Sequence, residues 1–124
     1  MKITITGYAS TIHLDKQGHI ILPSVWQSIN HKHPIPLLYE HDPRYIMGHV
    51  THHIITPLGL LITAEIHCTD QIIQMIQSRQ AYFSVGILAP SPANRYIIQA
   101  QLHEISLVCK PANPHCRVSI KGKP

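Results

Sequence analysis

Short runs of alternating apolar and polar residues dominate this chain, and turns rich in proline and glycine separate them. In the clearest run, Leu60, Ile62, Ala64 and Ile66 fall on one face of an extended segment. Alternation with a period of two is typical of a strand that buries one face. Ten prolines and six glycines are spread along the 124 residues, which keeps such strands short. The pattern therefore predicts a mainly β fold.

The same pattern, followed along the chain, predicts most of the elements. Strands are expected over Lys2–Ser10, His19–Leu22, Ile35–Tyr39, Ile46–Ile55, Leu60–His67, Ala81–Leu88, Arg95–Ala100 and Leu102–Cys109. Helical segments are expected over Val25–Ile29 and Asp70–Arg79, the second capped by Thr69 or Asp70. A turn is expected over Pro90–Asn94. The expected architecture is mainly β (α+β), a small closed or nearly closed antiparallel β-barrel with one or two flanking helices.

Length and charge define the expected class of protein. A chain of this size predicts a single domain over residues 1–124, with a core over about 3–118 and a basic tail over 117–124. The formal charge of +4 is otherwise scattered and is not interleaved with aromatic residues, so nucleic-acid binding is not favoured. Every apolar run is shorter than the roughly 18 residues of a membrane-spanning helix. We expect a cytosolic protein without a membrane partner.

Cysteines and histidines give little indication of a metal site or a disulfide framework. The three cysteines, Cys68, Cys109 and Cys116, contain no CxxC pair. The eleven histidines include no HExxH motif and no convincing helical i, i+4 pair. We therefore expect neither a metal nor a cofactor. A small β-barrel module that binds a metal or nucleic acid remains an alternative.

The segment Ala81–Leu88 contains the candidate nucleophile. Alternation places Phe83 and Val85 on one face, and Ser84 and Gly86 on the other. Because Gly86 lacks a side chain, a substrate backbone could approach Ser84 there. The alternative is a half-buried serine whose hydroxyl is bonded to the backbone.

A histidine and a glutamate elsewhere in the chain could serve such a serine. His41 follows a predicted strand and precedes Pro43, a position suited to a general base. Glu104 shares a predicted strand face with Leu102 and Val108, so its carboxylate needs a polar partner. A histidine ring is such a partner in a catalytic triad. The alternatives are an ordinary turn histidine and a buried structural ion pair, and spacing alone does not decide between these readings.

Several motifs in a fixed order make the sequence recognisable. They are Gly7-Tyr8-Ala9-Ser10 with Asp15, Gly18 and Ile21-Leu22-Pro23; Ile35 to Asp42 with Ile46 to Val50; Leu58-Gly59-Leu60 to Glu65; Tyr82 to Ile87; and Leu102 to Val108 with Pro111 to Pro114. Together they resemble the prohead (procapsid maturation) serine proteases of tailed bacteriophages, over roughly Ile5 to Val118.

The resemblance implies a fold like that of the herpesvirus assemblins and a set of catalytic roles. His41 would be the base, Ser84 the nucleophile and Glu104 the orienting acid. Assemblins have a histidine as third member, so the adjacent His103 is an alternative, although alternation turns it away from Glu104. From its position, the backbone N–H of Val85 or Gly86 is a candidate for the oxyanion hole.

The resemblance also implies the biological setting. The expected substrates are a scaffold protein, the scaffolding segment of the capsid protein, and the protease itself. Action would take place in the cytoplasm of the bacterial host, inside the assembling procapsid, and self-association is a further expectation. The alternative from another class is a catalytically silent assembly factor with the same fold. Ser10 and Ser106 are expected to be dispensable for the reaction of an activated serine with a fluorophosphonate probe.

Overall fold

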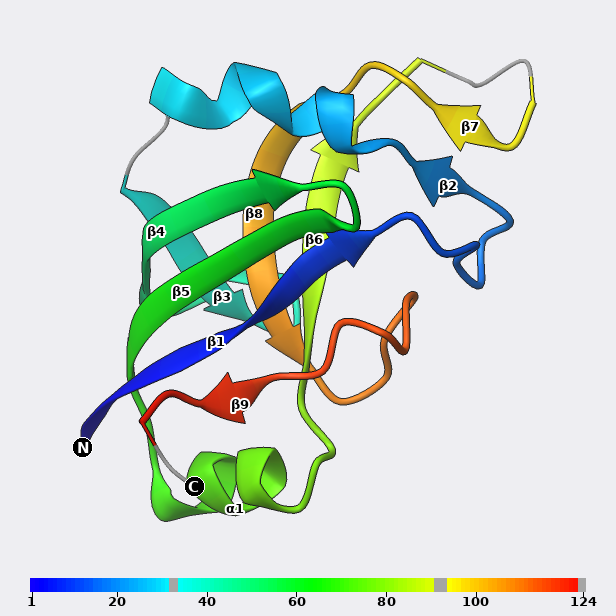
Figure 1. Cartoon of the computed structure of the whole chain (residues 1–124). Helices are drawn as coiled ribbons and strands as arrows, with labels where there is room; N and C mark the ends of the chain where they lie inside the picture. Colours follow the sequence, from blue (N-terminus) through cyan, green and yellow to red (C-terminus); the bar gives the residue numbers. More distant parts are fainter. Residues whose placement is uncertain (32–33, 91–93, 123–124) are drawn as a thin grey trace.

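A computed structural model describes residues 1–31, 34–90 and 94–122 of the chain, and most of its elements are strands (Figure 1). The strands are β1 (Lys2–Thr11), β2 (Ile20–Ile21), β3 (Ile35–Tyr39), β4 (Asp42–Thr56), β5 (Gly59–His67), β6 (Tyr82–Leu88), β7 (Tyr96–Ile97), β8 (Gln101–Val108) and β9 (Ser119–Ile120). The helices are the 3-10 helix η1 (Pro23–His31) and α1 (Asp70–Gln77). None of the helices in the described part of the chain has the length and apolar character that crossing a membrane requires.

Seven strands form one curled sheet in the order β6-β8-β3-β4-β5-β1-β9, and β2 pairs with β7 separately. The order has two ends, so the sheet is a half-barrel in which the ladders stop at β6 and β9. The prediction of a mainly β fold with a curled sheet is therefore confirmed. The closed or nearly closed barrel is not, because the sheet is an open half-barrel. It was also wrong that all strands are antiparallel, because β3 and β8 run parallel. The alternation of apolar and polar residues predicts where strands lie. It does not predict whether two strands that are distant in sequence pair in parallel or antiparallel.

The segment before β9 links the two ends of the sheet. Phe83 N donates to Cys116 O at 2.8 Å, and Val118 N donates to Ala81 O at 2.9 Å. Residues 119–120 then pair with β1, opposite Thr6 and Ile5. This part of the expected basic tail is thus a strand of the sheet, which the sequence pattern did not predict.

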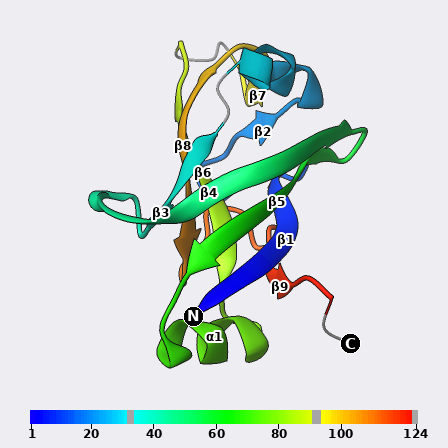
Figure 2. The ribbon, with the colours of Figure 1, turned by 90° about the vertical axis from the view of Figure 1, so that its left-hand side faces the viewer.

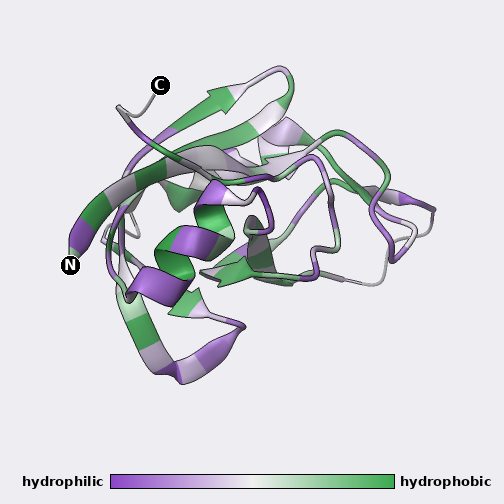
Figure 3. Ribbon diagram, turned by 90° about the horizontal axis from the view of Figure 1, so that it is seen from below, coloured by the Kyte–Doolittle hydropathy of each residue, from purple (hydrophilic) through white to green (hydrophobic). Residues whose placement is uncertain are grey.

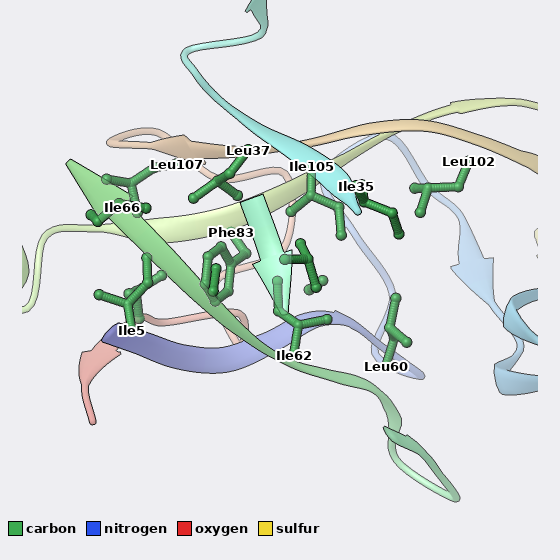
Figure 4. Close-up of a cluster of buried hydrophobic side chains, with 14 of the residues drawn as sticks. Ile5, Ile35, Leu37, Leu60, Ile62, Ile66, Phe83, Leu102, Ile105 and Leu107 are labelled. Carbon is green, nitrogen blue, oxygen red and sulfur yellow. The ribbon is translucent and has the colours of Figure 1, made fainter. Parts of the chain in front are cut away.

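The concave side of the sheet encloses the apolar core (Figure 4). Leu60, Ile62, Ala64 and Ile66 are all buried, as their alternation on β5 predicts. Phe83 enters the same core from β6, and only 1% of its surface is exposed. The face of β6 that carries Phe83 is therefore the core face, which leaves the opposite face to Ser84.

The helices close the two ends of the sheet, η1 beside β2 and β7, and α1 at the opposite end (Figures 1 and 2). The expected helix Val25–Ile29 lies within η1, and Trp26 packs inward with no exposed surface. In α1, the Thr69 side chain accepts a hydrogen bond from Ile72 N, as expected of the capping residue. Bands of apolar and polar residues alternate along α1 (Figure 3), and its Ile72 and Ile76 are buried.

Some element boundaries differ from the sequence prediction. The strand expected over Arg95–Ala100 is reduced to β7, and β4 begins at Asp42, earlier than expected. The predicted turn Pro90–Asn94 includes residues 91–93, which lie outside the described residues. In β8, the pairing shifts between Gly86↔Glu104 and Ile87↔Leu102, so His103 is an extra residue. This irregularity interrupts strict alternation and places Leu102 in the core, whereas the sequence pattern put it on the face of Glu104.

Candidate active site

His41 lies at the tip of the hairpin that joins β3 to β4. Tyr39 pairs with Asp42 across the turn, and the two residues between them, Glu40 and His41, have φ values of 53° and 60°. Left-handed values at both central positions are typical of a type I′ turn. This conformation is unfavourable for residues other than glycine, so surrounding contacts must hold it.

Hydrogen bonds to β8 and the residue after it supply those contacts. Glu40 N donates to Leu107 O at 3.0 Å, and Cys109 N donates to the Glu40 carboxylate at 3.1 Å. His41 N donates to Ser106 Oγ at 3.0 Å. The turn is therefore fixed to the strand that also bears Glu104.

Ser84 and Glu104 come from the neighbouring strands β6 and β8. Ser84 stands opposite Ser106, and Gly86 stands opposite Glu104. A Cβ on Gly86 would lie 2.2 Å from Glu104 Oε1. The sequence suggested that Gly86 admits a substrate backbone, whereas in the structure its missing side chain provides the space for the glutamate carboxylate.

The three predicted residues meet around the His41 ring. Its Nε2 lies 3.1 Å from Ser84 Oγ, and its Nδ1 is in hydrogen-bonding contact with Glu104 Oε1. A carboxylate only accepts, so Nδ1–H donates to Glu104, and the neutral ring then presents Nε2 as an acceptor for the Ser84 hydroxyl. The His41 side chain is 42% exposed and that of Glu104 is 18% exposed. The imidazole thus faces solvent while its carboxylate partner is largely shielded.

The two carboxylates beside His41 in the sequence have other partners. Asp42 accepts hydrogen bonds from Arg44, and these bonds hold the pKa of that carboxyl below its usual range. The Glu40 carboxylate accepts from Cys109 N, and its hydrogen bond to the Cys109 side chain raises the pKa of that thiol. Glu104 is the carboxylate that contacts the His41 ring.

Ser106 is a site residue that sequence reasoning missed. It has no exposed surface, and its Oγ donates to Glu104 Oε2 at 2.7 Å while accepting from His41 N. The expectation that Ser106 is dispensable does not fit these contacts. The available signal was its position two residues after Glu104, on the same predicted strand face.

A groove of about 140 Å³ borders Ser84 and His41 and extends along β6. Its walls come from β1, the loop after β1, β2, β7 and the loop before β9, and Ser10 lies among its residues. Along β6, the Phe83 N–H points away from β8 toward Cys116, so by alternation the Val85 N–H points to this outer edge as well. The Gly86 N–H points toward β8, opposite Glu104. Of the two oxyanion-hole candidates, Val85 is the one on the open edge.

The other candidates lie apart from this centre. His103 is exposed and borders a separate depression beside Pro36 and Gln101. Across residues 1–31, 34–90 and 94–122, no three His, Cys, Asp or Glu residues lie close enough to hold a metal ion together.

In sequence, the chain is similar to a prohead protease of a bacteriophage. No known protein-family model matches it. It is 30% identical over 125 aligned residues to the prohead protease of Escherichia phage T5. That alignment covers 90% of this chain and 59% of the phage protein, so the chain spans less than two thirds of its relative.

Solved structures show the same fold in herpesvirus proteases. The Kaposi's sarcoma-associated herpesvirus (KSHV) protease in complex with a hexapeptide phosphonate inhibitor matches with a TM-score of 0.68 and 11% identity, over 99% of this chain and 66% of that one. Varicella-zoster virus protease matches with a TM-score of 0.64 and 12% identity, over 100% of this chain and 66% of that one. The similarity to phage prohead proteases that the sequence motifs indicated is therefore confirmed, and the chain has the fold of the herpesvirus proteases.

Proposed function

We propose that this protein is a serine endopeptidase in which Ser84 is the nucleophile, His41 the general base and Glu104 the acid that orients His41. The observation that carries the proposal is the position of the His41 ring, with Nε2 3.1 Å from Ser84 Oγ and Nδ1 on the Glu104 carboxylate. Residues from three separate elements meet in the arrangement that activates a serine. A histidine in an ordinary turn would not need both partners.

The reaction follows from this arrangement. Ser84 Oγ attacks the carbonyl carbon of a peptide bond while its proton passes to His41 Nε2. Glu104 stabilises the imidazolium that forms, and His41 then gives the proton to the leaving amine. Water, activated by the same histidine, hydrolyses the acyl-enzyme and restores Ser84. In this scheme the Val85 N–H contributes to stabilising the oxyanion of the tetrahedral intermediate.

The groove along β6 is the proposed place of the substrate. Phe83 N–H is bonded to Cys116, but no described residue takes up the Val85 N–H at the outer edge. An extended peptide in the groove would lie beside this edge, with its scissile bond at Ser84. A strand edge with unused backbone groups favours an extended, unfolded segment over a compact substrate.

The proposed substrates are the scaffold protein, the scaffolding segment of the capsid protein, and the protease itself. The similarity to a phage prohead protease supports this setting, inside an assembling procapsid in the bacterial host. Self-association of the chain belongs to the same proposal. A catalytically silent assembly factor with this fold would not require the contacts of the His41 ring with Ser84 and Glu104.

Co-expression tests the proposed function. The protein is produced together with candidate capsid and scaffold proteins from the same genome, and cleavage is followed by mass spectrometry. The proposal predicts new termini in these proteins, which are absent when Ser84→Ala replaces the wild type. Identical termini with Ser84→Ala would contradict it.

A further inference from the structure

Ser106 connects two of the proposed catalytic residues through one buried hydroxyl. Its Oγ donates to Glu104 Oε2 at 2.7 Å and accepts from the backbone N–H of His41 at 3.0 Å. Ser106 is fully buried and stands directly opposite Ser84 in the ladder between β6 and β8. The hydroxyl has one proton to donate, and that proton is used on Glu104.

The two bonds act on different parts of the site. Glu104 uses Oε1 for the His41 ring and Oε2 for Ser106, so the two contacts together fix the plane of the carboxylate. The bond from His41 N fixes the backbone of a residue with a left-handed φ of 60°. Position and orientation of the imidazole therefore both depend on Ser106.

We infer that Ser106 is a positioning residue. It holds the Glu104 carboxylate and the His41 backbone at fixed positions relative to each other, so that the His41 ring reaches Ser84. This inference rests on the proposed function. A hydroxyl in a purely structural role would need one backbone partner, as Thr6 Oγ1 has in Ile62 O. Ser106 instead bonds to a carboxylate and to the turn that carries the base.

The rate of Ser84 labelling by a fluorophosphonate measures this role without a known substrate. In the labelling step Ser84 Oγ displaces fluoride from phosphorus, and the serine proton passes to His41. Ser106→Ala should lower the rate constant about 10- to 100-fold, the usual effect of losing a hydrogen bond to a charged group. Thr6→Val is the control, because it removes a partly buried strand hydroxyl that lies outside the groove. It should keep the wild-type rate.

Two further measurements separate positioning from a loss of stability. Ser106→Cys keeps nearly the volume of the side chain but supplies a weak donor, so it should also lose rate while its thermal midpoint stays near that of the wild type. In a Glu104→Gln background, Ser106→Ala should change the rate less than about twofold, since residues that act as a unit are not additive. The low-field proton resonance of His41 Nδ1–H should broaden in Ser106→Ala.

The outcomes distinguish this inference from the proposed function. Labelling of the wild type at Ser84 together with slow labelling of folded Ser106→Ala supports the inference. Labelling of Ser106→Ala at the wild-type rate overturns the inference and leaves the proposed function intact. Equal losses in the wild-type and Glu104→Gln backgrounds also overturn it. A wild type that is not labelled at Ser84 overturns the proposed function and the inference together.

Discussion

The carboxylate of Glu104 occupies the space in which a side chain of Gly86 would stand, across the ladder between β6 and β8. A Cβ at Gly86 would approach Oε1 to 2.2 Å, and Oε1 is the atom that contacts the His41 ring. Gly86, two residues after the proposed nucleophile Ser84, thus makes room for the third member of the proposed triad. Substitutions at Gly86 should act on the reaction before they act on the fold.

Gly86→Ala should lower the rate of fluorophosphonate labelling about 100-fold, because displacing a catalytic group by an ångström has an effect of that order. The displaced atom belongs to the end of a flexible side chain, so the thermal midpoint should change little. Gly48→Ala is the contrasting variant, since its Cβ would lie 1.9 Å from the backbone oxygen of Glu65. It should lose about 1–3 kcal/mol of stability. Equal labelling of wild type and Gly86→Ala would contradict the account of Gly86.

Two replacements of His41 should separate backbone strain from catalysis. Both His41→Ala and His41→Gly remove the imidazole, so both should be inactive. At a φ of 60°, alanine carries a left-handed penalty of about 1–2 kcal/mol that glycine avoids. Urea unfolding should therefore show His41→Gly to be the more stable variant by about 1 kcal/mol. A more stable His41→Ala would mean that the turn does not hold this conformation in solution.

The labelling rate should rise with pH, because only a neutral imidazole can accept the proton of Ser84. Glu104→Gln should reduce the rate about a thousandfold or more, since an amide neither stabilises the imidazolium nor fixes the required tautomer. Rates measured across the acid-to-neutral range, with the fold followed by circular dichroism, test both statements. A rate independent of pH would exclude His41 as the base.

The reactivity of the three cysteines tests the packing of the fold. Burial raises the pKa of the Cys116 thiol to about 12, and burial also raises that of Cys68. Burial also keeps the reagent away from Cys68 and Cys116, so iodoacetamide at mildly alkaline pH should modify exposed Cys109 and spare the other two, although Glu40 raises the pKa of Cys109 as well. Glu40→Gln should speed the reaction of Cys109, because Glu40 raises its pKa. Early modification of Cys116 in the native protein would contradict the packing of residues 116–118.

The sequence could predict those parts of the fold that depend on local alternation. The core face of β5 and the cap of α1 follow from patterns within one element, and the structure contains both. The motifs also pointed to His41, Ser84 and Glu104, which the structure brings together. Their catalytic roles remain predictions.

Features that depend on contacts between distant segments were not predictable. The extra residue at His103 changes the face of Leu102, and strand alternation alone cannot reveal such an irregularity. The role of the space at Gly86 depends on the register between β6 and β8. Ser106 was on the expected face, but its two bonds became visible only once the His41 turn was placed against β8.

The most direct test of the central claim is to identify the residue that a fluorophosphonate modifies in the native protein. Peptide mapping by mass spectrometry locates the adduct, and heat-denatured protein serves as the control. The account predicts a single adduct at Ser84, which is lost on denaturation and absent in Ser84→Ala. An adduct on another serine of the native protein, or equal labelling of native and denatured protein, would contradict it.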